Sequence, residues 1–138
     1  MTRPQDDHAS FARICVVDDD AAVRHAMCNL LKAGGYEVLA FDAGEALLEA
    51  QDLARIDVAV FDVKLRGMSG FTLLERFRER TRAEALAIPA LLISGHSDRA
   101  MEQRARDAGA LALLRKPVDP DYLFDRIEDA LALRNAAL

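Results

Sequence analysis

The sequence predicts one α/β domain built on a doubly wound, five-stranded parallel sheet with the strand order 2-1-3-4-5. Two observations carry this prediction: short apolar runs recur five times, and they alternate with amphipathic helical patterns. This alternation is typical of a parallel sheet, because a right-handed crossover through a helix joins each strand to the next. The chain has 138 residues, which is the size of a single domain.

The five predicted strands are short and almost continuously apolar. Such strands are typical of a parallel sheet that helices cover on both faces, where alternation with polar residues is lost. The runs comprise residues 14–17, 36–41, 58–61, 90–93 and 111–114.

Helices are predicted where apolar residues recur at helical spacing on one face. The clearest patterns are Val23, Met27, Leu30 and Leu31 early in the chain, Phe71, Leu74 and Phe77 in its middle, and Leu123, Ile127, Ala130 and Leu131 near its end. The second helix, over about residues 44–53, has the weakest pattern.

Residues with capping chemistry mark several of the predicted helix ends. Gly34-Gly35 and Gly109 stand where C-terminal caps belong. We interpret Asp42 with Glu45 as a capping box, and Asp119-Pro120 as an N-cap followed by proline at the first helical position.

The N-terminal residues and the length of the apolar runs indicate where the domain begins and whether the protein is exported or crosses a membrane. Residues 1–11 are expected to form a loose tail and residues 12–136 the domain. The first ten residues lack the order of a signal peptide, and no apolar run approaches the ~20 residues needed to cross a bilayer. We therefore expect a cytoplasmic protein without a membrane partner.

Cys15 and Cys28 have no C-x-x-C partner, so free thiols are expected.

The charge distribution argues against a nucleic-acid partner. The formal net charge is −5, and the 18 basic residues are scattered along the chain rather than gathered in one stripe. A nucleic-acid binder normally carries a concentrated basic face. An acidic chain of this size could instead hold a cation-binding pocket.

Polar residues interrupt the predicted strands at their carboxyl ends. The sequence Asp18-Asp19-Asp20 follows the first strand, Asp62 the third, Ser94 the fourth and Lys116 the fifth. Open α/β sheets bind ligands beyond the carboxyl ends of their strands, where the strand order reverses. With the order 2-1-3-4-5, all of these residues would form one site.

The residue types of this site suit phosphoryl transfer. Clustered carboxylates repel one another and need a cation, and magnesium characteristically binds one or two carboxylates together with phosphate. One carboxylate, Asp62, could then attack phosphorus and form an acyl phosphate. Lys116 and the Ser94 hydroxyl could contact the oxygens of the transferring group.

Four separated motifs resemble response-regulator receiver domains (CheY-like): VVDDD at 16–20, FDVKLRGMSG at 61–70, LLISGH at 91–96 and LRKP at 114–117. The resemblance covers about residues 12 to 135. It implies that Asp62 is the phospho-acceptor and that Mg²⁺ (or Mn²⁺) is held by Asp18, Asp19, Asp62 and the Lys64 backbone carbonyl. It further implies that Ser94 is a switch hydroxyl and that Lys116 contacts the phosphoryl group, with a cis bond to Pro117.

The resemblance also implies partners. A histidine kinase or histidine phosphotransfer protein would supply the phosphoryl group, and the domain would signal by protein–protein contact through its helix four–strand five–helix five face. It would not be an enzyme beyond its own phosphorylation and dephosphorylation.

We expect a stand-alone receiver. A degenerate receiver that acts only as a binding module and a fragment of a longer DNA-binding regulator stay open as alternatives. Tyr122, Phe124 and Leu133 could form a weak dimer face or a partner site.

Several positions depart from the family pattern or have two readings. Arg66-Gly67 stands where a proline is usual, and Leu113 replaces the usual aromatic switch residue, so the output half of the domain looks modified. Val118 also replaces an aromatic.

The side chains of Lys64 and His96 could tune the lifetime of the phosphoryl group or be plain surface groups. For three further residues we favour the simpler reading: an N-cap rather than a third metal ligand for Asp20, a solvated side chain for Asp57, and a surface position for His25.

Overall fold

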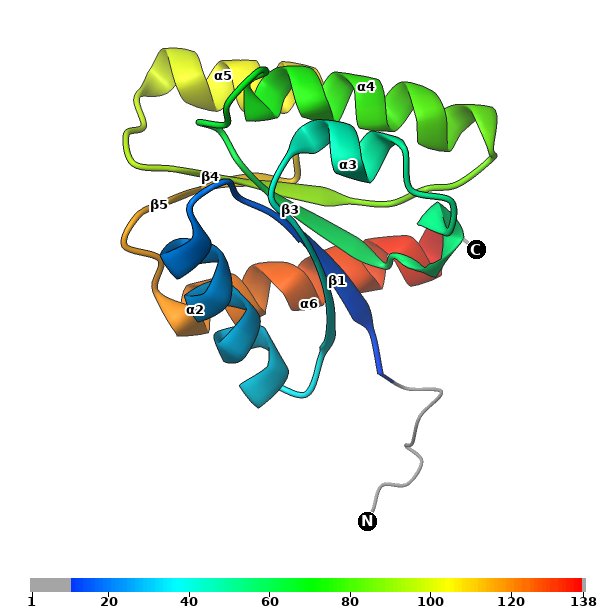
Figure 1. The fold of residues 1–138 in the computed structure, drawn as a ribbon, viewed down its shortest axis with the longest axis horizontal. Helices are drawn as coiled ribbons and strands as arrows, with labels where there is room; N and C mark the ends of the chain where they lie inside the picture. Colours follow the sequence, from blue (N-terminus) through cyan, green and yellow to red (C-terminus); the bar gives the residue numbers. More distant parts are fainter. Residues whose placement is uncertain (1–10, 138) are drawn as a thin grey trace.

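The computed structural model describes residues 11–137 and confirms the predicted sheet (Figure 1). Most of the predicted tail, residues 1–10, lies outside this range. Five parallel strands lie in the order β2-β1-β3-β4-β5. They are β1 (Arg13–Val17), β2 (Glu37–Phe41), β3 (Val58–Asp62), β4 (Ala90–Ser94) and β5 (Ala112–Arg115).

Helices cover both faces of this sheet, as the alternation of patterns predicts. Figure 1 shows α3, α4 and α5 on one face and α2 and α6 on the other. The helices are α2 (Ala21–Ala33), α3 (Gly44–Leu48), α4 (Gly70–Ala83), α5 (Arg99–Ala108) and α6 (Pro120–Ala137), and a short 3-10 turn, η1 (Leu53–Arg55), precedes β3. Within residues 11–137, no helix is both long and apolar enough to span a membrane.

The core consists of two apolar clusters, one on each face of the sheet. Successive residues of a strand point to opposite faces, so Cys15 and Val17 join one cluster while Ile14 and Val16 join the other. In the cluster beneath α3, α4 and α5, the rings of Phe61 and Phe77 pack edge to face with their centroids 5.4 Å apart. Burial on both faces explains why the strands show little polar alternation.

Most of the predicted caps are confirmed. The Asp20 carboxylate accepts hydrogen bonds from the backbone N–H groups of Ala22 and Val23, and Asp119 caps α6 in the same way. Gly109 ends α5 with a φ of +94°, in the left-handed region where glycine is favoured. The side chains of Ser69 and Asp98 cap α4 and α5.

The capping box at Asp42 and Glu45 is wrong. The N-cap of α3 is Ala43, and no side chain caps this helix. Strand β2 runs to Phe41, so Asp42 stands one residue too early to reach the first turn. The predicted helix over residues 44–53 is also too long: α3 ends at Leu48, and Leu53 belongs to η1.

The solvated reading of Asp57 is also wrong. Its carboxylate accepts hydrogen bonds from the Arg13 backbone N–H at 2.8 Å and from Nε of Arg134 at 3.1 Å. The side chain of Asp57 therefore joins the start of β1 to the C-terminal part of α6. The surface position of His25 is confirmed, and Cys15 and Cys28 are free thiols, both buried.

One glycine fixes how closely α4 approaches the end of β3. The Gly70 N–H donates to the Val63 carbonyl at 2.7 Å. A Cβ atom at residue 70 would collide with the Asp62 carbonyl oxygen and would lie 2.8 Å from the Cα of Val63. Both neighbours are backbone atoms, which cannot rotate away as a side-chain end can.

We expect Gly70→Ala to lower the free energy of unfolding by about 1–3 kcal/mol, because overpacking against backbone outweighs the usual gain of alanine in a helix. Urea unfolding followed by circular dichroism measures this. Gly95→Ala is the matched control, since a Cβ there meets nothing within 4 Å, and it should change stability by less than about 0.5 kcal/mol. Equal unfolding midpoints for the two variants would contradict the prediction.

Candidate functional site

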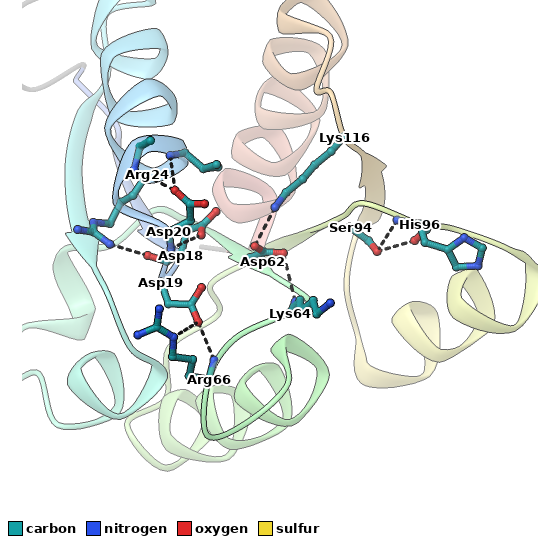
Figure 2. Close-up of polar contacts among 12 residues, drawn as sticks. Asp18, Asp19, Asp20, Arg24, Asp62, Lys64, Arg66, Ser94, His96 and Lys116 are labelled. Atoms are coloured by element: carbon teal, nitrogen blue, oxygen red, sulfur yellow. Dashed lines mark hydrogen bonds and ion pairs between the residues drawn. The ribbon is translucent and has the colours of Figure 1, made fainter.

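The residues singled out at the strand ends come together at one edge of the sheet (Figure 2). Asp62 is the last residue of β3 and Ser94 the last of β4, while Asp18 and Lys116 directly follow β1 and β5. Because β1 and β3 are neighbours, the acidic residues after β1 lie beside Asp62. The strand order therefore assembles the site, as the sequence predicts.

Asp62 is buried and its carboxylate has a partner on each oxygen. Only 7% of the residue is exposed. Oδ2 accepts a hydrogen bond from the Lys116 ammonium at 2.9 Å, and Oδ1 accepts one from the Lys64 backbone N–H at 3.2 Å. These contacts hold the carboxylate at the mouth of the pocket.

Lys116 is the basic partner of this carboxylate. Burial alone would lower the pKa of its ammonium, but the hydrogen bond and charge of Asp62 outweigh that effect and raise the pKa. Its backbone N–H donates to the Ser94 carbonyl at 2.8 Å, which ties the residue to the end of β4. The predicted cis bond between Lys116 and Pro117 is confirmed.

Asp18 is a buried carboxyl group whose ionised form is disfavoured in the pocket. It is 5% exposed, and Oδ1 accepts a hydrogen bond from the Asp20 backbone N–H at 2.9 Å. Burial raises the pKa of its carboxyl group, and the negative charges of Asp62 and Asp19 raise it further. The Asp20 hydrogen bond and the Lys116 charge oppose the rise without cancelling it. The negative charge of Asp18 is thus only partly compensated by its neighbours.

Asp19 is held by a residue that sequence reasoning did not assign to the site. Its Oδ2 accepts a hydrogen bond from the Arg66 backbone N–H at 2.8 Å, and Nε of the same arginine lies 3.7 Å away. A second arginine was also missed: Nη1 of Arg24 donates to the Asp18 carbonyl at 2.8 Å. The replacement of the usual proline by Arg66 was the one available signal.

Ser94 is buried but its hydroxyl is bonded within its own loop. Oγ donates to the His96 carbonyl and accepts from the His96 N–H. The His96 imidazole is exposed and pairs with the Asp98 carboxylate at 3.2 Å. Figure 2 shows this imidazole directed away from Asp62, whereas the backbone N–H of Lys64, two residues after Asp62, donates to the Asp62 carboxylate.

Leu113 lies in β5 opposite Leu92 of β4. It is half-buried and packs against the apolar cluster that α3, α4 and α5 cover. The position therefore contributes to the core of the α5–β5 region.

The acidic residues fit a magnesium ion that keeps part of its water shell. Within residues 11–137, no group of three or more histidine, cysteine or acidic residues is arranged so that it alone could hold a metal ion. Magnesium does not need one, because it usually binds one or two carboxylates and retains several waters. Asp18, with its raised pKa beside Asp62 and Asp19, is the kind of carboxylate that gains from a nearby cation.

A five-stranded parallel α/β sheet in the order 2-1-3-4-5, with a carboxylate–lysine pair in an acidic pocket at its carboxyl edge, is the architecture of a class of signalling domains. The chain belongs to the response regulator receiver domain family, whose model matches residues 14–128. Receiver domains are signalling modules of two-component systems. They are typically non-enzymatic, generally use Mg²⁺ and generally have a histidine kinase as partner.

Individual relatives agree with this assignment. The transcriptional regulatory protein FixJ of Bradyrhizobium diazoefficiens is 36% identical over 118 residues, which cover 86% of this chain and 56% of FixJ. A receiver domain from Clostridium thermocellum superposes with a TM-score of 0.83 at 26% identity, over 93% of this chain and all of the other. The chemotaxis protein CheY4 of Vibrio cholerae gives 0.79 at 27% identity, over 88% of this chain and 99% of CheY4. The chain spans about half or less of the length of curated relatives such as FixJ and NtrC of Escherichia coli.

Because the pKa of Asp18 is raised, we expect Asp18→Asn to increase the free energy of unfolding when a chelator is present. The size of this increase should depend on pH. Between the unfolded pKa of about 3.9 and the raised folded value, the native wild type binds a proton that the unfolded chain has lost. Its free energy of unfolding therefore falls as pH rises through this window. Asparagine removes this cost and can still accept the Asp20 hydrogen bond.

Asp18→Asn should thus be more stable than wild type at pH 7, and the difference should disappear as pH falls below about 4, the unfolded pKa. Urea unfolding at a series of pH values measures it. Asp52→Asn, at an exposed aspartate, is the control and should show no such trend. A gain from Asp18→Asn that is the same at every pH would contradict the electrostatic explanation.

Proposed function

We propose that this receiver domain accepts a phosphoryl group on Asp62 in a magnesium-dependent reaction and signals by protein–protein contact. One observation carries the proposal. The Asp62 carboxylate is buried at the end of β3, bonded to Lys116 at 2.9 Å, in the pocket that also holds Asp18 and Asp19. A structural ion pair would not need two further carboxylates beside it.

The residues have separate roles in this transfer. A carboxylate oxygen of Asp62 attacks phosphorus, and the bond from phosphorus to the donor's histidine nitrogen breaks with its electron pair left on that nitrogen. Bound magnesium supplies positive charge that screens the carboxylates and the phosphoryl oxygens. We propose Asp18, Asp19, Asp62 and the Lys64 carbonyl as its ligands. The Lys64 N–H keeps the carboxylate oriented, and Lys116 moves its contact from the carboxylate to a phosphoryl oxygen.

Ser94 would report that the pocket is phosphorylated. Its hydroxyl must give up both hydrogen bonds to the His96 backbone before it can reach a phosphoryl oxygen. Residues 95–98 connect it to Asp98, the N-cap of α5. A change at Ser94 is thereby coupled to the start of α5.

We propose a histidine kinase or histidine phosphotransfer protein as phosphodonor, and an effector that contacts the face formed by α5, β5 and α6. Tyr122 and Leu133 are exposed on α6 and could contribute to that contact or to a weak homodimer. A second candidate function is supported by the names of relatives such as FixJ, which are transcriptional regulators. In that case the domain would control a DNA-binding output within a longer protein.

Incubation with a small phosphodonor and magnesium should add one phosphoryl group to the chain, measured as intact mass. The adduct should be absent from Asp62→Asn, because the amide is not a nucleophile toward phosphorus, and absent when a chelator removes the metal. Asp52→Asn, at an exposed aspartate, should be phosphorylated like wild type. If wild type takes up no phosphoryl group from any donor, a phosphorylation-independent binding module is the better reading.

We propose that Lys64, more than His96, tunes the lifetime of the acyl phosphate. The Lys64 backbone N–H is bonded to the Asp62 carboxylate, whereas the imidazole of His96 is held by Asp98. Lys64→Ala should change the half-life of the phosphorylated form several-fold without altering the rate of phosphorylation, and His96→Ala should change the half-life less. His25→Ala, an exposed site on α2, is the control. Equal half-lives for Lys64→Ala and wild type would defeat the proposal.

A further inference from the structure

Arg66 lies beside Asp19, on the side of the acidic pocket opposite Lys116 (Figure 2). Figure 2 shows the Asp62 carboxylate directed at Lys116 and the Asp19 carboxylate directed at Arg66. The Arg66 N–H donates to Oδ2 of Asp19 at 2.8 Å, and Nε lies 3.7 Å from the same oxygen. Two of the pocket carboxylates thus have a basic residue of the chain beside them.

The loop after β3 makes this double contact possible. A proline at residue 66 would have no N–H to donate, so the hydrogen bond to Asp19 depends on the residue that stands there. Gly67 follows with a φ of +84°, which turns the chain directly after Arg66. The Arg66 side chain is 90% exposed and the Asp19 side chain 21% exposed, so the charge is placed at the mouth of the pocket.

We propose that Arg66 is a tethered cation that competes with the divalent metal for Asp19 and so weakens the metal affinity of the pocket. This inference rests on the proposed function, in which Asp19 is a metal ligand. Both Arg66 contacts fall on Oδ2. An ion that bound either oxygen of this carboxylate would therefore lie close to a guanidinium of like charge.

The size and salt dependence of the effect follow from the exposure of the pair. Exposed ion pairs are worth little, so removing the guanidinium should tighten metal binding by about two- to fivefold rather than by orders of magnitude. Screening is nearly complete at 1 M salt, where the Debye length is about 3 Å, so the difference should shrink there. Arginine stays protonated, so the effect should not vary across neutral pH.

The test is a magnesium titration of the unphosphorylated chain, followed by backbone amide NMR shifts with no phosphodonor present. Arg66→Ala keeps the backbone N–H and removes the charge, so it should bind Mg²⁺ about two- to fivefold more tightly than wild type. Arg66→Gln should do the same, and it stands in if the alanine variant does not fold. Arg66→Lys keeps the charge and should stay close to wild type.

Arg55→Ala is the control for net charge. Arg55 is exposed in η1, before β3, at the edge of the sheet opposite Asp62. Its removal lowers the net charge by the same amount without touching Asp19, so its affinity for Mg²⁺ should equal that of wild type. If Arg55→Ala tightens binding as much as Arg66→Ala does, the effect is general and the inference is overturned.

The outcomes separate this inference from the proposed function. If wild type binds Mg²⁺ and Arg66→Ala binds it equally or more weakly, Arg66 does not compete for Asp19, while the proposed magnesium site stands. If neither binds Mg²⁺ at tens of millimolar, the proposed metal site fails and the inference fails with it. Binding by Arg66→Ala but not by wild type would support competition.

Discussion

The repulsion among carboxylates at the carboxyl edge of the sheet is the interaction on which the rest of the site depends. The strand order β2-β1-β3-β4-β5 brings Asp18 and Asp19 beside Asp62. Burial raises the pKa of Asp18 and the charges of Asp62 and Asp19 raise it further, so an ionised carboxylate is costly there. Lys116 and Arg66 each offset part of this cost at one carboxylate. Lys116 pairs with Asp62 and Arg66 with Asp19, so Asp18 has no basic side chain of its own among the residues that the structure describes. A divalent cation in the pocket would supply the missing positive charge.

Rigid backbone supports this strained arrangement. Gly70 lets α4 approach the Asp62 carbonyl closely, and the Lys116 N–H is bonded to the end of β4. At the other edge of the sheet, Asp57 fastens Arg134 of α6 to the start of β1. The reactive groups therefore lie on strand ends whose positions are fixed by packing on both faces, which is the condition for holding like charges close together.

Local patterns predict the fold of this chain and the residues that gather at the carboxyl edge of its sheet, but not the contacts that complete the site. Buried parallel strands show in the sequence as apolar runs, and Asp62 stands out because a lone carboxylate ends one of them. The pair of Asp57 and Arg134 joins residues 77 positions apart, and Arg66 reaches Asp19 across 47 positions, so no local pattern indicates either contact. The capping box at Asp42 failed for the converse reason: the residue types fit the local pattern, but α3 begins at Gly44, so its N-cap is Ala43 and Asp42 lies one residue before that cap.

A signal can leave the pocket through the loop after β4 more readily than through β5. Ser94 is held by the backbone of His96, and Asp98 two residues later caps α5, so the hydroxyl proposed as the switch and the N-cap of α5 are four residues apart. Leu113 of β5 is half-buried against the α3–α4–α5 cluster and has no ring to swing between buried and exposed positions. A partner that reads the N-terminal end of α5 would therefore sense the switch hydroxyl directly, whereas one that depends on a rotating aromatic in β5 would find no such group in this chain.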